Sequence, residues 1–172
     1  MNTTTRSIAL GVGVALVIIA GVFGYQYFLN ASAGERYVNE EYGFSFAVPE
    51  GFEVREVENV VVIDNEAGEG VQVVMTPIGE DIQTLTEERI KSDLPELVIR
   101  APQTVRVGEG RSGLAFKSDN PVFDGASSEI WFVYPKCSQG VCQNYLYQIA
   151  TYERLDSLLL SVVGTWDLDI HR

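Results

Sequence analysis

The sequence predicts an α+β fold with a largely antiparallel central sheet and flanking helices, preceded by one N-terminal transmembrane helix. An uncharged apolar segment occupies residues 8–29, and strand-like segments fill most of the remaining chain. Only two later segments have helical character. Because the strands come in runs and do not alternate regularly with helices, antiparallel pairing is favoured over βαβ units.

The apolar segment from Ile8 to Leu29 has no charged residue over 22 positions. As a helix at roughly 1.5 Å per residue it would span about 33 Å, enough to cross a hydrocarbon core of about 30 Å. Arg6 precedes it without any acid, so the positive-inside rule predicts a cytoplasmic N-terminus. We therefore expect four parts: a cytoplasmic stub at 1–7, a signal anchor in the membrane lipid at 8–29, a linker at 30–36 and an exported α+β domain at 37–172.

Small residues in and after this segment suggest two further properties, cleavage by signal peptidase and dimerisation of the helix. Ala31-Ser32-Ala33 matches the A-x-A pattern of signal-peptidase sites, so cleavage after Ala33, giving a secreted protein, is the alternative. The apolar run exceeds the usual length of a cleaved signal, which favours an uncleaved anchor. The small-xxx-small pairs Gly11/Ala15 and Ala20/Gly24 would allow a weak homodimer through the transmembrane helix.

The charge is carried almost entirely by the predicted exported part. The chain has 24 acids against 12 bases, and only Arg6 lies before residue 34, which leaves residues 34–172 with 24 acids, 11 bases and a net charge of −13. Nucleic-acid binding requires clustered Lys and Arg to neutralise phosphates. We therefore exclude nucleic acid as a partner.

The first half of the exported part is dominated by strand patterns. In 42–49 the apolar residues alternate, with Tyr42, Phe44, Phe46 and Val48 on one face. Acids and glycines predict a turn at 64–70. Further strands are expected at 52–57, 60–63 and 71–76, the last closed by Pro77.

The second half contains both predicted helices. The first covers 85–94; its capping box pairs Thr84 with Glu87, and Pro95 ends it. Its apolar content is thin, so we expect it on the surface. The second helix, 156–163, is apolar enough to pack broadly on a sheet. Strands are expected at 103–107, 114–117, 128–134 and 145–151, with a short terminal strand at 165–168.

Cys137 and Cys142 are the best-defined chemical feature. They flank a four-residue loop containing Gly140, between two alternating aromatic strands, which predicts a β-hairpin with the thiols opposite each other. Export into an oxidising space favours a disulfide. The alternatives are reduced bystanders, a redox pair, or a metal site that would have to recruit His171.

Other motifs do not indicate catalysis, a cofactor or a metal. The G-x-G-x-x-G pattern at 108–113 is followed by strand residues and not by a helix, so it predicts a turn and no dinucleotide site. The loop acids lack EF-hand spacing, although calcium binding there stays open. A Ser–His–Asp triad would need the penultimate His171. The loop acids considered are Asp64, Glu66, Glu69, Asp119 and Asp124.

The stretch Tyr37-Val-Asn-Glu-Glu-Tyr-Gly-Phe-Ser-Phe-Ala-Val-Pro-Glu-Gly-Phe52 resembles the opening of PsbP-like domains, which begin with a similar motif forming a first hairpin. The helix at 156–163, after a Tyr-rich strand, is similar to the family's closing element. The resemblance covers about 37–168 and implies an α/β/α sandwich of the PsbP/Mog1 type. It also implies an extracytoplasmic accessory protein without catalysis. The metal- and photosystem-docking residues of the plant members match no position here.

These observations predict a membrane-tethered, extracytoplasmic interaction or accessory module that is not an enzyme and binds an unknown protein partner. One alternative is a small-ligand or lipid-binding domain, in which the Tyr- and Phe-rich strands would line a cleft. The other is a membrane-proximal hydrolase that uses carboxylates, which requires acids converging on a pocket.

Overall fold

A computed structural model of the protein describes residues 35–107, 111–120 and 125–168. The chain divides into two units, 1–33 and 34–172, and the described residues belong to the second. The expected membrane segment 8–29 lies outside them. Among the residues that the structure describes, no helix is long and apolar enough to span a bilayer.

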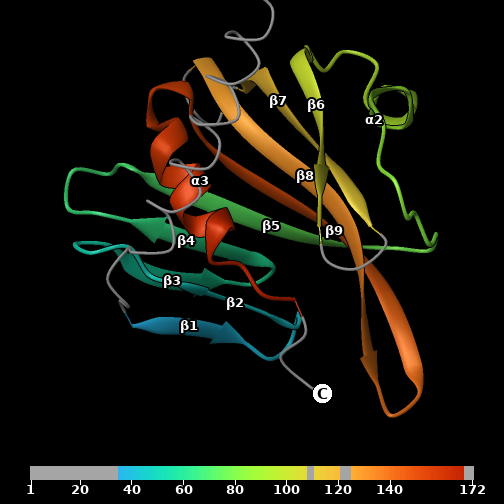
Figure 1. The fold of residues 1–172 in the computed structure, drawn as a ribbon, viewed down its shortest axis with the longest axis horizontal. Helices are drawn as coiled ribbons and strands as arrows, with labels where there is room; N and C mark the ends of the chain where they lie inside the picture. Colours follow the sequence, from blue (N-terminus) through green and yellow to red (C-terminus); the bar gives the residue numbers. More distant parts are fainter. Residues whose placement is uncertain (1–34, 108–110, 121–124, 169–172) are drawn as a thin grey trace, which may run out of the picture. The chain divides into compact units, whose positions relative to one another are not determined.

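A seven-stranded sheet forms the centre of the fold (Figure 1). Every neighbouring pair in it is antiparallel. The α+β class with an antiparallel sheet is therefore confirmed. In spatial order the strands are β3 (Glu53–Val57), β4 (Val60–Asp64), β5 (Gly70–Ile78), β9 (Val141–Tyr152), β8 (Gly125–Ser138), β7 (Ser112–Asn120) and β6 (Arg100–Arg106).

A separate hairpin, β1 (Arg36–Asn39) with β2 (Phe44–Ala47), precedes the large sheet. The turn residue Gly43 has φ +77°, a conformation that glycine adopts without steric cost. The alternation expected in 42–49 is present, because Phe44 and Phe46 are both fully buried in the main core. This core also holds residues from β4, β5, β8, β9 and the last helix.

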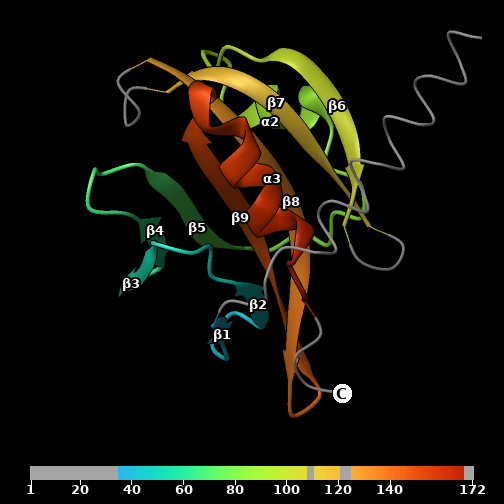
Figure 2. The same cartoon turned by 60° about the vertical axis from the view of Figure 1, so that its left-hand side comes forward.

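The two helices cover opposite faces of the sheet. Successive strand residues point to opposite faces, and on β8 Phe132 belongs to the main core while Trp131 belongs to a second cluster. The main core includes Leu159 of α3 (Asp156–Gly164), and the second includes Ile90 of α2 (Glu87–Asp93). Figure 2 shows α3 on the near side of β8 and β9 and α2 behind them. A 3₁₀ turn, η2 (Glu153–Leu155), leads into α3.

The structure corrects the start of the first helix. Thr86, not Thr84, is the N-cap of α2, and its hydroxyl accepts a hydrogen bond from the Arg89 amide. Thr84 instead forms a bridge to Ser112. Residues 83–85 thus pair with the start of β7, and this tertiary pairing takes precedence over the local capping box. The expectation that this helix lies on the surface holds only in part, because Leu85 and Ile90 are buried in the second core cluster, against residues of β7 and β8.

The prediction that Pro77 closes the strand at 71–76 is wrong. β5 continues to Ile78, with Pro77 opposite Tyr145 of β9. In β5 the backbone nitrogens of residues 75 and 77 point to the same side of the strand. The Met75 amide donates a hydrogen bond to the Asn59 carbonyl, on the side where β4 lies. Because β4 begins at Val60, position 77 has no strand on that side, so a proline there removes no ladder hydrogen bond.

The expected terminal strand at 165–168 is reduced to one bridge. Asp167 and Ser45 exchange two backbone hydrogen bonds, 2.8 and 2.9 Å long, which fasten the segment after α3 to β2. Arg36 reinforces the junction, since its Nε and Nη2 donate to Ser45 Oγ at 3.0 and 2.8 Å. The two ends of the described domain are therefore fastened side by side.

Candidate functional site

Cys137 and Cys142 lie opposite each other in the β8–β9 ladder, with their Cα atoms 4.0 Å apart and their sulfurs bonded. They belong to the arm, defined here as residues 136–143, in which the β8–β9 hairpin projects beyond the rest of the sheet (Figures 1 and 2). β7 pairs with β8 as far as Trp131, and β5 with β9 as far as Asn144, so the arm is a two-stranded ribbon. Its tip carries Val141, which is 73% exposed.

The glycine pattern at 108–113 joins two antiparallel strands. β6 ends at Arg106 and β7 begins at Ser112, so a strand follows these glycines as expected, and not the helix that a dinucleotide site requires. The last glycine has a packing role. A Cβ on Gly113 would lie 2.5 Å from the carbonyl oxygen of Trp131 on β8.

The loop acids within the described residues are paired with arginines or exposed. Asp64 pairs with Arg55, and Glu69 with Arg154, whose hydrogen bond lowers the pKa of Glu69. Asp119 pairs with Arg100 at 3.1 Å. Glu66 is exposed. Asp124 and His171 lie outside the described residues, within which no cluster of three metal-ligating side chains occurs.

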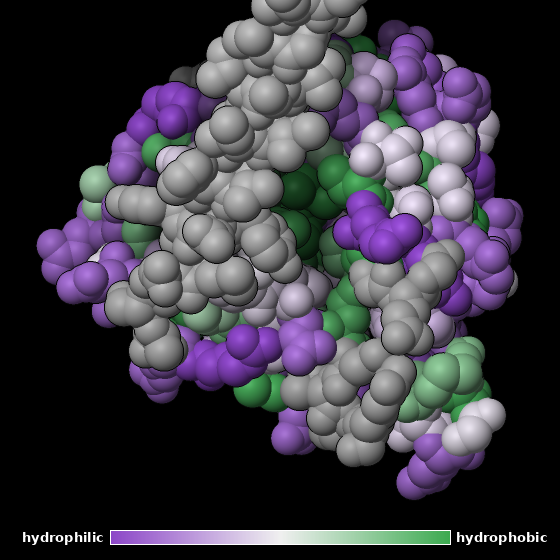
Figure 3. Space-filling view, in the orientation of Figure 1, coloured by the Kyte–Doolittle hydropathy of each residue, from purple (hydrophilic) through white to green (hydrophobic). Residues whose placement is uncertain are grey.

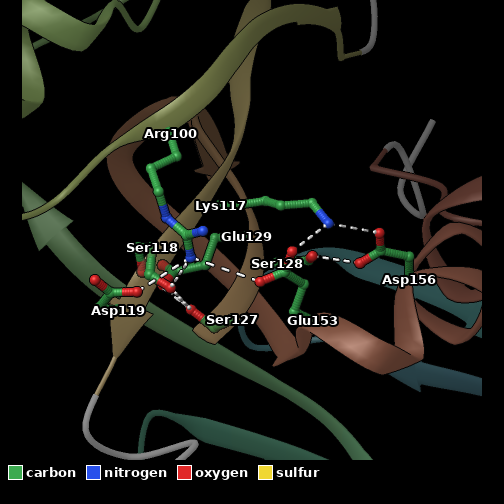
Figure 4. Close-up of polar contacts among 9 residues, drawn as sticks. All are labelled: Arg100, Lys117, Ser118, Asp119, Ser127, Ser128, Glu129, Glu153 and Asp156. Atoms are coloured by element: carbon green, nitrogen blue, oxygen red, sulfur yellow. Dashed lines mark hydrogen bonds and ion pairs between the residues drawn. The ribbon is translucent and has the colours of Figure 1, made fainter. Parts of the chain in front are cut away.

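A buried hydroxyl–carboxylate network lies on the α2 face of the sheet, where β7 and β8 pair (Figure 4). Glu129 accepts hydrogen bonds from Ser118 Oγ, from Ser127 Oγ at 2.7 Å and from Trp131 Nε1 at 2.7 Å. Both serines are fully buried and Glu129 is 2% exposed. A substrate could not reach these oxygens without opening the sheet, so we assign the network a structural role.

An ion-pair cluster lies near the start of α3 (Figure 4). Lys117 Nζ is 2.8 Å from Glu153 Oε1 and 3.2 Å from Asp156 Oδ2, and Arg100 Nη2 is 3.6 Å from Glu153 Oε2. The hydrogen bond to Glu153 raises the pKa of Lys117, and the same bond lowers the pKa of Glu153. Ser128 Oγ donates to Asp156. The cluster fastens η2 and α3 to β7 and β8.

The strongest candidate site is an apolar groove of about 370 Å³ between α3, the segment after it, and strands β6 and β8. We call it the α3 groove. Its size is at the small end of ligand sites, which hold about 300–1,000 Å³. Figure 3 shows a hollow with hydrophobic residues at its floor near the centre of the α3 face. The lining residues are Val105, Arg106, Val107, Ile130, Phe132, Tyr134, Leu160, Val163, Trp166, Asp167 and Leu168.

Trp166 forms one wall of the α3 groove. Its ring stacks on Phe44 at 4.5 Å and on Phe46 at 5.5 Å, and it meets Phe132 edge-on at 6.4 Å. The indole Nε1 is buried and makes no hydrogen bond within the described structure. A buried donor without an acceptor costs about 1–3 kcal/mol, so the ring contacts and not a hydrogen bond hold Trp166 in place.

Other hollows also occur among the described residues. One, of about 850 Å³, lies over β3, β4 and the 65–67 turn, where Arg55 and Asp64 pair with each other and Glu53 and Glu66 are exposed. A second, of about 480 Å³, lies between β1 and β3. A third, of about 200 Å³, shares Ile130 and Leu160 with the α3 groove and ends at Lys117 and Asp156. The first two are lined by several charged residues and the third is smaller, so we prefer the α3 groove.

The sequence predicts this site only in outline. Aromatic strands lining a cleft were one expected alternative, and Phe132 and Tyr134 do line the groove. Val105, Leu160 and Trp166 come from three separate segments, and no local motif connects them.

A scan against models of known protein families finds no match, and a search of curated proteins finds no relative.

Proposed function

We propose that the protein is a membrane-tethered, extracytoplasmic, non-catalytic binding module, and that the α3 groove holds its ligand. The observation that carries this proposal is the groove itself, an open, mostly apolar site of about 370 Å³ that the aromatic residues Phe132, Tyr134 and Trp166 line. Ligand sites typically combine mostly apolar walls with a few polar groups that orient the ligand. The tether is proposed from the uncharged segment 8–29.

We include in this proposal a PsbP/Mog1-type α/β/α sandwich for the domain. It is supported by the Tyr37–Phe52 motif, whose residues form the β1–β2 hairpin, and by helices on both faces of an antiparallel sheet. Superposition on an experimental PsbP-like structure tests this part, because strand order and helix placement must both agree.

Ligand binding is tested by ¹⁹F NMR of the full-length chain labelled with 5-fluorotryptophan, in nanodiscs of neutral phosphatidylcholine. The protein has two tryptophans. Trp166 lines the groove, whereas Trp131 packs on the opposite face, so one molecule contains both reporter and control. Titration with the neutral probe 1-octanol should shift the Trp166 resonance saturably and leave Trp131 unchanged. A Trp131→Phe variant assigns the two signals.

The matched variants are Leu160→Asn and Leu94→Asn. Both leucines are about half exposed, and only Leu160 lines the groove. Losing part of a leucine contact costs roughly 1 kcal/mol, so Leu160→Asn should weaken octanol binding about fivefold, while Leu94→Asn binds like the parent. The absence of a saturable Trp166 shift, or equal effects of the two substitutions, would contradict a ligand site in the groove.

The orientation of the chain is tested separately by alkaline phosphatase fusions at each end of the chain. Alkaline phosphatase needs an oxidising exported space to become active, so a fusion after Arg172 should be active and remain in the membrane fraction. A fusion before residue 8 should be inactive. Activity of only the N-terminal fusion would reverse the proposed topology.

A protein partner that docks on the arm is a second candidate function. This candidate is favoured by the shape of the arm, which projects from the sheet, is closed by a disulfide and carries the exposed Val141 at its tip. A photocrosslinking residue at Val141 should capture one discrete protein in intact cells, and the same residue at Val57, exposed on β3, should not. Equal capture at both positions would count against the arm.

A further inference from the structure

One edge of the large sheet is formed by β6, which pairs with β7 and with no other described strand (Figure 2). The Val107 amide donates to the Arg111 carbonyl, whereas the amide of Ser112, directly opposite Arg106, donates to the segment before α2. Because hydrogen-bonded and non-hydrogen-bonded pairs alternate in an antiparallel ladder, the backbone N–H and C=O groups of Thr104 and Arg106 face away from β7. Both residues are exposed, so β6 presents an open row of backbone donors and acceptors.

This open row is short, because the chain itself blocks one end of it. Pro102 has no amide hydrogen, and the pairing with β7 shifts register between Arg100 and Gln103. Ala101, in the irregular part, has φ +49°. Prolines and bulges are devices by which proteins protect exposed sheet edges from unwanted pairing. The regular stretch 103–107 has neither device, so a short extended segment can be added there.

The charge along this edge is opposite to the charge of the domain. Residues 97–107 contain Arg100 and Arg106 and no acid, although residues 34–172 carry a net charge of −13. Arg100 is paired with Asp119, whereas Arg106 forms no ion pair with another described residue. The charge available beside the open backbone groups is therefore positive. Opposite charges on neighbouring strands attract and like charges repel, which favours an acidic segment.

The other edge of the sheet, β3, lacks this combination of properties. Glu53 and Glu56 lie on β3 and both are exposed, so acidic side chains accompany its backbone. The Tyr37 hydroxyl of β1 donates a hydrogen bond to Glu56, which places β1 beside this edge. The two edges thus differ in charge and in cover, and β3 serves as an internal control for β6.

The side chains of β6 define which residues an added strand should carry. Val105 and Val107 pack against the main core on the α3 face, so Thr104 and Arg106 point to the α2 face. In an added antiparallel strand, the residue opposite Arg106 lies on the same face as Arg106, and its two neighbours lie beside the valines. An acid between two apolar residues therefore matches this edge.

We infer that β6 binds an extended acidic segment of a partner protein by strand addition, with backbone hydrogen bonds to Thr104 and Arg106 and a carboxylate opposite Arg106. Main-chain hydrogen bonds supply affinity in this mode of recognition, and alternate side chains supply specificity. This surface is an addition to the ligand site proposed above and does not depend on it.

The test uses the synthetic peptide acetyl-Ser-Val-Glu-Val-Thr-Val-Ser-amide, in which Glu and Thr would lie opposite Arg106 and Thr104. It is titrated into the full-length chain in neutral phosphatidylcholine nanodiscs, and amide hydrogen exchange is measured residue by residue. Without peptide the Thr104 and Arg106 amides should exchange rapidly, because no described strand covers them. The peptide should slow both amides saturably and leave the amides of β3 unchanged.

Two changes in the peptide separate the charge from the backbone contacts. A peptide with Gln in place of Glu should bind about threefold more weakly, and one with Lys more weakly still, since cross-strand charge pairs are modest in strength. A peptide methylated on the Glu and Thr backbone nitrogens cannot donate to β6 and should not bind.

Two pairs of variants test the same contacts from the protein side. Thr104→Pro removes an N–H that β7 does not use, so the fold should persist while peptide binding is lost. Thr104→Val keeps this N–H and should bind like the parent, and equal urea midpoints show that both variants are folded. Arg106→Gln should abolish the preference for Glu over Gln, whereas Lys136→Gln, which changes a cation in the arm, should keep it.

The outcomes either support strand addition or overturn it. Equal binding of the methylated peptide, unchanged binding by Thr104→Pro, or tightest binding of the Lys peptide overturns it. Slow exchange at Thr104 and Arg106 without peptide would mean that another segment already occupies the edge, which also overturns the inference. Should Thr104→Pro not fold, the methylated peptide tests the same hydrogen bonds. None of these readouts uses Trp166, so the proposal for the α3 groove is decided separately.

Discussion

Gly113 belongs to the glycine pattern at 108–113, but packing against β8, and not nucleotide binding, explains why a glycine occupies this position. A Cβ at this position would lie 2.5 Å from the Trp131 carbonyl oxygen and 2.8 Å from Phe132 Cβ. Both atoms belong to β8, whose backbone is fixed by pairing on two sides. The glycine thus permits close approach of β7 and β8.

We predict that Gly113→Ala destabilises the protein by about 1–3 kcal/mol, the usual cost of overpacking. The control is Gly79→Ala, where an added Cβ would meet nothing within 4 Å. Urea unfolding followed by tryptophan fluorescence measures both, since both tryptophans lie in the 34–172 unit. A stability of Gly113→Ala equal to that of Gly79→Ala would refute the packing role.

The Lys117–Glu153 pair predicts a defined pH dependence of stability. The pKa of Glu153 is lowered on folding, so its contribution is present above the unfolded value of about 4.3 and is lost as pH falls through the folded value. The pKa of Lys117 is raised, so its contribution is present below about 10.4 and is lost as pH rises through the folded value.

Lys117→Met should therefore be less stable than the parent at neutral pH, and the difference should shrink below about pH 4 and above about pH 10. Arg100 and Asp156, the other charges of the cluster, are retained in both proteins. The control is Lys136→Met, which removes a lysine that forms no ion pair among the described residues. A pH-independent effect of Lys117→Met would contradict the assignment.

At the scale of elements, the arm and α3 contribute to stability in different ways. The disulfide closes a six-residue ring, which on the chain-entropy model constrains the unfolded state by only about 2 kcal/mol. It holds a ribbon that has no neighbouring strand on either side. α3 instead buries Leu159 and Val162 in the main core.

We predict that the Cys137→Ala/Cys142→Ala variant loses about 2 kcal/mol of unfolding free energy and keeps the fold. Urea unfolding of oxidised and reduced parent protein provides the comparison, and reduced parent should match the double variant. Complete unfolding of the variant at neutral pH would show that the arm contributes more than ring closure.

Adjacent leucines in α3 provide a sharper test of the helix. Leu159 is 4% exposed in the core and Leu160 is 50% exposed at the groove rim. Leu159→Ala should cost about 2–5 kcal/mol through lost burial and a cavity, whereas Leu160→Ala should cost much less. Urea midpoints of the two variants measure these losses. A larger loss in Leu160→Ala would contradict the structure, in which Leu159 and not Leu160 faces the core.

Comparison of the expected and observed ends of each element shows where local sequence patterns are sufficient to place a strand or helix. Strands 52–57 and 60–63 and helix 156–163 occur within one residue of their expected ends, because alternation and apolar content agree with burial there. Thr84 and Pro77 were misassigned because a bridge to Ser112 and an open position beside β4 decide their roles. Both are properties of neighbours that lie far away in the sequence.

At the scale of the whole molecule, a membrane anchor predicts the mass of the mature chain. We expect the purified protein to retain residues 8–29, since the apolar run is longer than a cleaved signal requires. Intact-mass spectrometry measures this directly. A mature start at Gly34 would replace the tethered module with a secreted one, and the groove would remain.

The sequence by itself determined the α+β class, the antiparallel pairing, most strands, both helices and the hairpin that places Cys137 opposite Cys142. These depend on periodicity, turn chemistry and short loops, all of which are local. Only the tertiary structure decided the strand order, the two helix-covered faces and the α3 groove. Val105, Phe132, Leu160 and Trp166 meet because β6, β8, α3 and the segment after it converge across the sheet. Long-range packing, which single-segment patterns do not encode, therefore creates the candidate site.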